Sequence, residues 1–474
     1  MAILSVDAGT TGVTAVILDH SGQVIGHGYQ EFAQHFPQPG WVEHNPEEIW
    51  SAVLKATGFA LAQAPEKPTA IGITNQRETI VLWDKTTLKA PRNAIVWQDR
   101  RHVDLGFDAA TRSRVQQQTG LPLDPYFSSS KLLWIQQNEP EIWAGVSQGR
   151  TAIGTIDSYL IARMSGGRHH VTDASNASRT QFLDLKTGTW SSELLALFGV
   201  PVEALPRVVA SYGNLADTMP EAFLGLHLPI TGIAGDQQAA LFGQCAFEAG
   251  DAKCTYGTGA FMLKNTGAEI LVNEDLISTI AWQHPNGELV YAIEGSTFVA
   301  GAAVQWLRDG LGIIKDSSEV ESLAADSADG VIFVPALTGL GAPFWNPDAR
   351  GELSGLTRGS TKAHIARATL DGIAMQVYCV AELMGQIGRL RVDGGASANN
   401  LLMQIQADLL QTIVERPTHV EATAIGAAYL AGLGSGFWAS QAELRELNPI
   451  TARFNPGTRD TQLIERWVAA ARSI

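Results

Sequence analysis

The chain has 474 residues, a formal net charge of −15 at pH 7, and 45% hydrophobic against 17% charged residues. This length exceeds what one hydrophobic core usually organises, so we expect two or three domains. The acidic balance argues against nonspecific nucleic-acid binding and against attraction to an anionic membrane. An anionic ligand could still bind where backbone amides and a few cations act locally.

Cysteine usage and the apolar segments indicate a cytoplasmic protein. Cys245, Cys254 and Cys379 are widely spaced, match no metal-ligand pattern and lie in apolar contexts. We therefore expect packed free thiols in a reducing compartment. The N-terminus reaches Asp7 too early for a signal peptide. The apolar stretch 423–438 is interrupted by glycines, which favours a buried helix over a membrane span.

The first motif is a loop of small residues between two apolar strands. Strands are predicted at 2–6 and 13–18, joined by Asp7-Ala-Gly-Thr-Thr-Gly12. Glycines let backbone N–H groups approach an anion closely, and Thr10 and Thr11 add hydroxyl donors. Asp7 could then hold Mg²⁺, directly or through water. An ordinary hairpin is the alternative.

Polar or aromatic residues follow several predicted strands and loops of the first half. A buried strand at 70–74 runs into Asn75-Gln-Arg77-Glu78-Thr79, where Arg77 and Glu78 could bond adjacent hydroxyls of a small ligand. A solvated hairpin tip with a local ion pair explains the same pattern. Trp97 could form an apolar wall or belong to the core. Tyr126 lies near the start of a predicted helix, with a phenol free to bond a ligand.

Asp236 lies at a predicted strand-to-helix junction. An apolar run from 228 to 234 is followed by Gly235-Asp236-Gln237 and a helical segment. Ligands of α/β proteins bind at the carboxyl edge of the sheet, so Asp236 could be a general base or orient a hydroxyl, with Gln237 fixing the substrate. The alternative is plain helix capping, since Asp is a favoured N-cap residue.

The second half repeats the arrangement of the first. A strand at 251–256, the loop Gly257-Thr-Gly259 and a returning strand at 260–264 mirror the first hairpin. A strand at 390–393, the turn 394–400 and a helix mirror the junction at Asp236. Two similar domains with a cleft between them follow, which we place at 1–246 and 247–474. Chance recurrence of glycine-rich loops is the alternative.

These motifs together resemble those of the FGGY carbohydrate kinases. The resemblance is carried by Asp7-Ala-Gly-Thr-Thr11, Gly232-Ile-Ala-Gly-Asp236, Thr255-Tyr-Gly-Thr-Gly259 and Asp393-Gly-Gly-Ala-Ser-Ala-Asn-Asn400. Longer runs, among them Gly72-Ile-Thr-Asn-Gln-Arg-Glu-Thr79, resemble the family members that phosphorylate glycerol. The similarity extends from residue 3 to about residue 438, so it covers nearly the whole chain.

The resemblance implies an α/β, actin-like fold of two ribonuclease-H-like domains with the active site in the cleft between them. It also implies roles for individual residues. The polyol pocket would comprise Arg77, Glu78, Trp97, Tyr126, Asp236, Gln237 and Phe261, with Asp236 as the base. Asp7 would organise Mg²⁺. ATP would be bound by Thr10, Thr11, Thr258, Gly259, Gly394, Gly395, Ala396 and Asn399.

The implied activity is in-line transfer of a phosphoryl group from ATP to glycerol, giving sn-glycerol 3-phosphate. A kinase for another short polyol or sugar of the family is an alternative, motivated by departures from the family pattern at Ser129, Ser130 and Ala174. A non-catalytic, nucleotide-switched binding protein is a second alternative. We expect a small-molecule substrate and neither nucleic acid nor membrane insertion, while a homodimer or homotetramer stays open.

Overall fold

The first half of the chain forms a six-stranded sheet in a computed structural model that describes residues 1–101, 106–418 and 421–474. Strand β1 pairs antiparallel with β2 and parallel with β5, and β5 pairs parallel with β14. The spatial order is β13 (Tyr212–Asp217), β14 (Pro229–Gly235), β5 (Pro68–Asn75), β1 (Ala2–Ala8), β2 (Gly12–Leu18) and β3 (Val24–Glu31).

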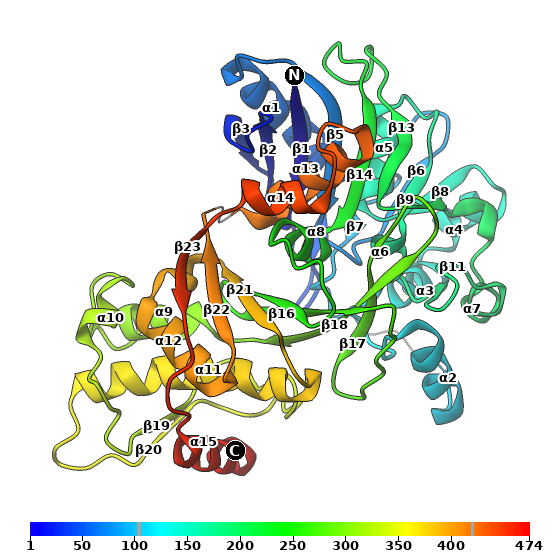
Figure 1. The fold of residues 1–474 in the computed structure, drawn as a ribbon. Helices are drawn as coiled ribbons and strands as arrows, with labels where there is room; N and C mark the ends of the chain where they lie inside the picture. The colour runs from blue at the N-terminus through cyan, green and yellow to red at the C-terminus, as the bar shows by residue number, and fades with distance from the viewer. Residues whose placement is uncertain (102–105, 419–420) are drawn as a thin grey trace.

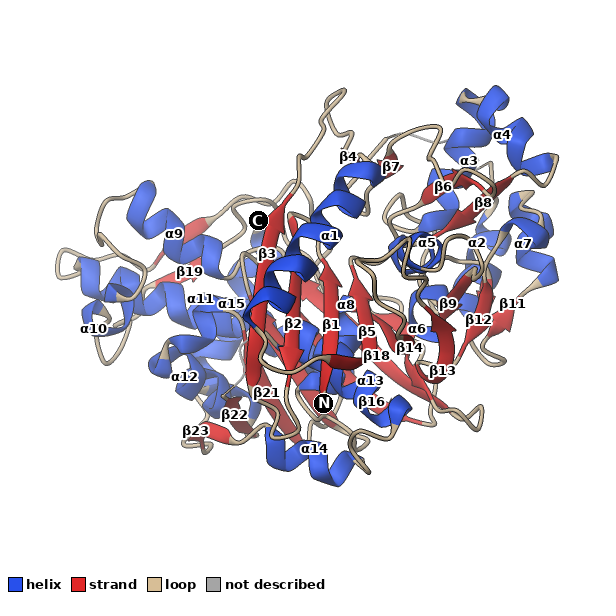
Figure 2. Ribbon diagram, turned by 90° about the horizontal axis from the view of Figure 1, so that it is seen from above, coloured by secondary structure: helices blue, strands red, loops and turns tan. Residues whose placement is uncertain are grey.

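Both faces of this first sheet are buried, because helices pack on each side. Alternate residues of β1 point to opposite faces and so contact different helices. Leu4 and Val6 pack under α1 (Pro46–Gln63), whereas Ile3 packs with α8 (Asp236–Gly243) and α13 (Ala422–Ser435). Figure 2 shows α1 over one face of the sheet. The helix begins after Asn45, whose side chain accepts from the Glu47 amide, and Pro46 occupies its first turn.

The second half builds a seven-stranded sheet on the same plan. Strand β15 pairs antiparallel with β16 and parallel with β21, as β1 does with β2 and β5. The order is β17 (Ile277–Gln283), β18 (Leu289–Thr297), β16 (Ala260–Gly267), β15 (Asp251–Tyr256), β21 (Arg389–Asp393), β22 (Ile413–Pro417) and β23 (Ile450–Phe454). The repeat predicted from the glycine-rich loops is therefore confirmed, and so is the α/β class.

Helices of the second half pack mainly on its own sheet. Helix α11 is long and amphipathic, and its buried face joins the largest core cluster. Apart from α13, the described helices of this half are α9 (Gly301–Asp309), α10 (Glu319–Leu323), α11 (Lys362–Met384), α12 (Asn400–Leu410), α14 (Gln441–Leu447) and α15 (Thr461–Ser473), with the short strands β19 (Ile332–Val334) and β20 (Glu352–Ser354).

Helix α13 is an exception, because it lies against the first sheet although it belongs to the second half. Figure 1 shows it, in orange, beside the blue and green strands β1, β5 and β14. Glycines permit this approach: a Cβ on Gly72 would lie 2.1 Å from the Ala427 carbonyl oxygen, and one on Gly426 would lie 1.8 Å from that of Ala239 in α8. The two halves are thereby joined by a packed apolar contact.

Residues 81–209 add shorter elements beside the first sheet. They include β6 (Val81–Asp84), β7 (Ala94–Ile95), which pairs with β4 (Glu43–His44), β8 (Thr151–Gly154), β9 (Val171–Asp173), β10 (Leu183–Asp184), β11 (Thr189–Trp190) and β12 (Arg207–Val209), with helices α2 (Ala109–Thr119), α3 (Ser128–Asn138), α4 (Pro140–Ser147), α5 (Ile156–Met164), α6 (Ala174–Ala177) and α7 (Ser192–Phe198). The three cysteines are buried and free, as predicted. Across the described ranges, no helix has the length and apolarity needed to span a membrane.

Candidate active site

The predicted polyol residues converge at one edge of the first sheet. Strands β1, β5 and β14 are parallel neighbours, so their carboxyl ends meet at the same edge. Asp7 lies near the end of β1, Arg77 and Glu78 follow β5, and Asp236 follows β14. The topology therefore brings together side chains from three distant parts of the sequence, at the edge where α/β proteins bind ligands.

Asp236 is the first residue of α8, and its carboxylate contacts both its own helix and Arg77. Its Oδ1 accepts from the Gln237 amide at 2.7 Å and lies 3.1 Å from Arg77 Nε. Gly235, rather than Asp236, is the N-cap residue, so capping does not explain the carboxylate. The side chain keeps 27% of its surface exposed. Burial raises the pKa of Asp236, and Arg77 opposes this rise.

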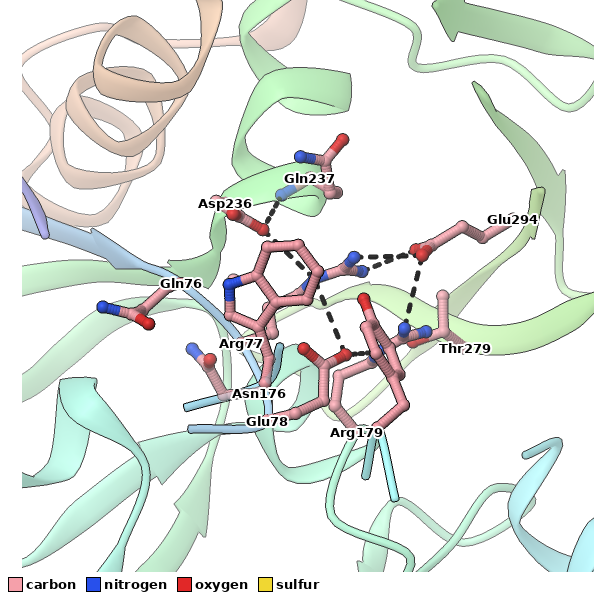
Figure 3. A network of polar contacts seen from close by, with 12 residues as sticks. Gln76, Arg77, Glu78, Asn176, Arg179, Asp236, Gln237, Thr279 and Glu294 are labelled. Atoms are coloured by element: carbon pink, nitrogen blue, oxygen red, sulfur yellow. Dashed lines mark hydrogen bonds and ion pairs between the residues drawn. The ribbon is translucent and has the colours of Figure 1, made fainter. Parts of the chain in front are cut away.

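Arg77 and Glu78 are buried, which rules out the solvated hairpin tip. Arg77 Nη1 and Nη2 donate to the two carboxylate oxygens of Glu294 at 2.5 and 3.0 Å, as Figure 3 shows. Glu78 Oε1 accepts from Arg179 Nε at 2.6 Å. Glu78 has a φ of 59°, a left-handed conformation that is uncommon outside glycine and clusters at functional sites. Burial raises the pKa of Glu78, against the attraction of Arg179 and Arg77.

Trp97 and Tyr126 form an aromatic corner beside these charges. Their rings meet edge to face at 5.7 Å, and Trp97 Nε1 donates to Thr10 Oγ1 at 3.0 Å. Trp97 thus connects the predicted polyol pocket to the first predicted phosphate loop. Lys131, at the start of α3, donates to the carbonyl oxygens of Pro125 and Tyr126 at 2.8 and 2.7 Å and so holds the loop that carries Tyr126.

Gln237 and Phe261 lie where the second sheet faces α8. The Gln237 amide oxygen accepts from Lys253 Nζ, which also donates to Thr255 Oγ1 at 3.0 Å. In the ladder of β16 with β18, Phe261 pairs with Ser296 and Leu263 with Glu294. Paired residues of antiparallel strands share a face, so Phe261 lies on the same side of the sheet as Glu294.

The first predicted phosphate loop is held by hydrogen bonds from Gln76, the residue that follows β5, to its carbonyl groups. The Gln76 amide bonds the Ala8 carbonyl at 2.9 Å, and Gln76 Nε2 bonds that of Gly9 at 2.9 Å. Thr11 is exposed at the tip of the loop. Within the part of the chain that the structure describes, Asp7 Oδ1 is buried and has no hydrogen-bond partner. Burial, followed by repulsion from Asp236 and Glu421, raises the pKa of Asp7 to about 8.

The second loop and the glycine turn belong to the second sheet. A cavity of about 380 Å³ lies between them and α9, and four predicted nucleotide residues line it: Thr258, Gly395, Ala396 and Asn399. Gly394 is at φ 83°, and a Cβ there would lie 2.5 Å from the Tyr256 carbonyl oxygen. Gly259 is equally confined, since its Cβ would lie 2.3 Å from the Thr297 carbonyl oxygen. Both glycines are therefore required by close backbone packing.

Sequence reasoning missed three charged residues of this site: Arg179, Glu294 and Lys253. All are buried, and each contacts a predicted polyol residue. A signal existed for two of them, because Glu294 directly follows an apolar run and Lys253 stands between Ala252 and Cys254 inside a predicted strand. An ionised side chain in such a place is costly unless it is paired. Arg179 follows a short helix and offered no comparable signal.

Each of the two sheets begins with a hairpin whose loop consists of small residues, and Asp236 follows the last strand of the first sheet. This repeated plan defines the actin-like class of two-lobed nucleotide-binding proteins. The family models agree with this class. Residues 2–243 match the N-terminal domain of the FGGY family of carbohydrate kinases, and residues 252–435 match its C-terminal domain. The chain belongs to the FGGY family of carbohydrate kinases.

Within this family, the chain is similar to glycerol kinases. The chain is 47% identical to the glycerol kinase of Bdellovibrio bacteriovorus, over 100% of this chain and 99% of the relative. It is 50% identical to that of Dechloromonas aromatica, over 98% and 96%. Among solved structures, Plasmodium falciparum glycerol kinase with ADP superposes with a TM-score of 0.92 at 34% identity, covering 100% of this chain and 98% of the other.

Proposed function

We propose that this chain transfers the γ-phosphoryl group of MgATP to a terminal hydroxyl of glycerol, forming sn-glycerol 3-phosphate. Full-length identity of 47–50% to glycerol kinases supports the choice of substrate. The observation that carries the chemistry is the Asp236 carboxylate, partly exposed at the carboxyl edge of the sheet and 3.1 Å from Arg77 Nε. It combines a proton acceptor with an adjacent donor for a polyol hydroxyl.

Each residue of the proposed pocket contacts a different part of glycerol. Arg77 can donate to a hydroxyl and Glu78 can accept from one, while Asp236 holds the hydroxyl that reacts. The ring of Trp97, set against Tyr126, presents an apolar surface to the carbon chain. Gln237 and Phe261 complete the proposed pocket from α8 and the second sheet. A site whose buried polar groups pair with every hydroxyl rejects analogues that lack one.

The nucleotide and its metal fit the residues present. Thr10, Thr11, Thr258 and Gly259 offer hydroxyl and backbone donors for phosphates, and the cavity beside 394–399 offers space for the nucleoside. The buried, unpartnered Asp7 Oδ1 is a carboxylate oxygen of the kind that Mg²⁺ prefers. Mg²⁺ held there with ATP would neutralise phosphate charge. A cation would also relieve the repulsion between Asp7 and Asp236 that raises the Asp7 pKa.

Transfer then consists mainly of alignment. The terminal hydroxyl oxygen of glycerol bonds the γ-phosphorus as the bond from that phosphorus to the β–γ bridging oxygen breaks, and ADP leaves. Asp236 accepts the hydroxyl proton. In a loose transition state this proton moves late, so Asp236 orients the nucleophile as well as deprotonating it. The acidic charge of −15 is consistent with a cytoplasmic enzyme for a small molecule.

The test is a substrate panel with purified protein, MgATP, and glycerol, erythritol, xylulose, ribulose or gluconate. ADP release and the phosphorylated product are measured for each compound. We expect kcat/KM for glycerol to exceed that for every other member by at least about tenfold, a difference of about 1.4 kcal/mol in transition-state binding. A preference for a ketose, a sugar acid or erythritol would contradict the assignment of glycerol.

A further inference from the structure

Beneath the proposed polyol pocket, five charged side chains form one continuous network. Asp236 contacts Arg77, Arg77 pairs with both oxygens of Glu294, Glu294 Oε1 lies 3.3 Å from Arg179 Nη2, and Arg179 Nε donates to Glu78 at 2.6 Å. Figure 3 shows Glu294 reaching both guanidinium groups from the side opposite Asp236 and Glu78. The two arginines thus share one carboxylate.

Of the five residues, Glu294 alone comes from the second sheet. It lies on β18, next to β17, and this edge is packed against the first half of the chain. Thr279 on β17 bonds Ser178 Oγ at 2.8 Å and Gln238 Nε2 at 3.1 Å. Ile280 joins an apolar cluster with Ala174 and Ala177 of α6. Glu294 is therefore held rigidly against the pocket.

Glu294 also fixes the direction of the Arg77 guanidinium. The bidentate pair uses one N–H from each Nη atom, and Nε points toward Asp236, so rotation of the group would break three contacts at once. Arg179 and Arg77 hold the pKa of Glu294 at about 2 against the effect of burial, so the carboxylate stays ionised. Without its charge, two buried guanidinium groups would lose their common partner.

We propose that Glu294 is a positioning residue that aims Arg77 at one hydroxyl of the substrate and thereby sets the selectivity for a triol. The inference rests on the proposed glycerol kinase activity and deepens it. Glu294 touches no reacting atom in this scheme. It acts through Arg77 directly and through Arg179 on Glu78, so both hydroxyl-binding groups depend on one carboxylate of the opposite sheet.

The experiment measures kcat/KM for glycerol, 1,2-propanediol and 1,3-propanediol in the full-length enzyme and in Glu294→Gln. Each diol lacks one hydroxyl of glycerol. The matched control is Glu415→Gln, because Glu415 is also a buried glutamate of the second sheet shared by two arginines, Arg391 and Arg453, at 3.4 and 2.6 Å. Glu294→Asp, which keeps the charge on a shorter side chain, serves as the second test variant if Glu294→Gln does not fold.

We expect Glu294→Gln to lower kcat/KM for glycerol by about 10²-fold or more and to shrink the preference over at least one diol by about tenfold, since the aimed donor matters only when its hydroxyl is present. Glu294→Asp should lose part of the same preference. Glu415→Gln should leave both preferences within about twofold of wild type. Equal losses for all three substrates, or the same change in Glu415→Gln, would overturn the positioning role. Wild-type enzyme inactive toward glycerol would instead overturn the proposed function, before any variant is compared.

Discussion

At the scale of single residues, Asp236 is the side chain on which the proposed chemistry depends. Substitution Asp236→Asn keeps the size of the side chain and an acceptor for the Gln237 amide, but removes the proton acceptor and one partner of Arg77. We expect kcat for glycerol to fall by roughly 10²–10⁴-fold, the usual contribution of a general base. Steady-state kinetics at saturating MgATP measure this loss.

The control for Asp236→Asn is Asp371→Asn. Asp371 is also an aspartate paired with an arginine Nε, that of Arg367 at 2.8 Å, but it is buried and lies on α11 in the second half. Its substitution should change kcat by less than about twofold. Near-normal turnover in a folded Asp236→Asn enzyme would mean that Asp236 is not the base.

Residue-scale prediction succeeded where a short motif carried the information and failed where the chemistry depended on long-range contacts. The run Asn75 to Thr79 predicted a polar cluster after a strand, and its side chains are indeed buried at the sheet edge. Nothing local pairs Arg77 with Glu294, because 217 residues separate them. The network exists only after the two sheets have packed together.

At the scale of elements, the turn after β21 depends on Gly394. Its φ of 83° and the 2.5 Å approach of a Cβ to the Tyr256 carbonyl oxygen leave no room for a side chain. We expect Gly394→Ala to lower the free energy of unfolding by roughly 1–3 kcal/mol and to raise KM for ATP. Thermal unfolding and ATP-dependent kinetics measure the two effects.

Gly395→Ala provides the stability comparison for this prediction. A Cβ on Gly395 meets no atom within 4 Å, so the free energy of unfolding should change by less than about 0.5 kcal/mol. If the two alanine variants were equally stable, the turn would not require the conformation described for Gly394.

The elements themselves were largely predictable, for physical reasons that differ between them. Apolar runs predicted β1, β2, β5 and β14, and a helix was predicted after the turn 394–400, where α12 lies. The sequence also indicated that α13 is a buried helix. It did not indicate that α13 packs on the first sheet. Small residues such as Gly426 permit a close contact with another element, but they do not specify which element that is.

At the scale of the whole molecule, the contact between α8 and α13 joins the two halves. A Cβ on Gly426 would lie 1.8 Å from the Ala239 carbonyl oxygen, so Gly426→Ala must separate the helices. Overpacking of this kind usually costs about 1–3 kcal/mol of unfolding free energy. Because Asp236 begins α8, we also expect a lower kcat. Denaturant unfolding and kinetics on the same preparation measure both quantities.

Gly58→Ala is the control, because Gly58 lies in the middle of α1 and a Cβ there meets nothing within 4 Å. Removing a mid-helix glycine should raise the free energy of unfolding by roughly 0.5–1 kcal/mol. A Gly426→Ala enzyme as stable and active as wild type would show that the α8–α13 contact does not hold the site together. The boundary between residues 246 and 247 stays a prediction.

The central claim is that a polyol and a nucleotide phosphate meet between the two sheets, beside Asp236. A crystal structure of the wild-type enzyme with glycerol and a non-hydrolysable ATP analogue tests it most directly. We predict density for a three-carbon triol within hydrogen-bond distance of Asp236 and Arg77, with one terminal hydroxyl facing the γ-phosphate and the nucleoside in the cavity beside 394–399. A triol seated elsewhere, for example in the cavity of about 450 Å³ between Asp371 and Asp460, with the Asp236 edge closed to ligand, would contradict the account.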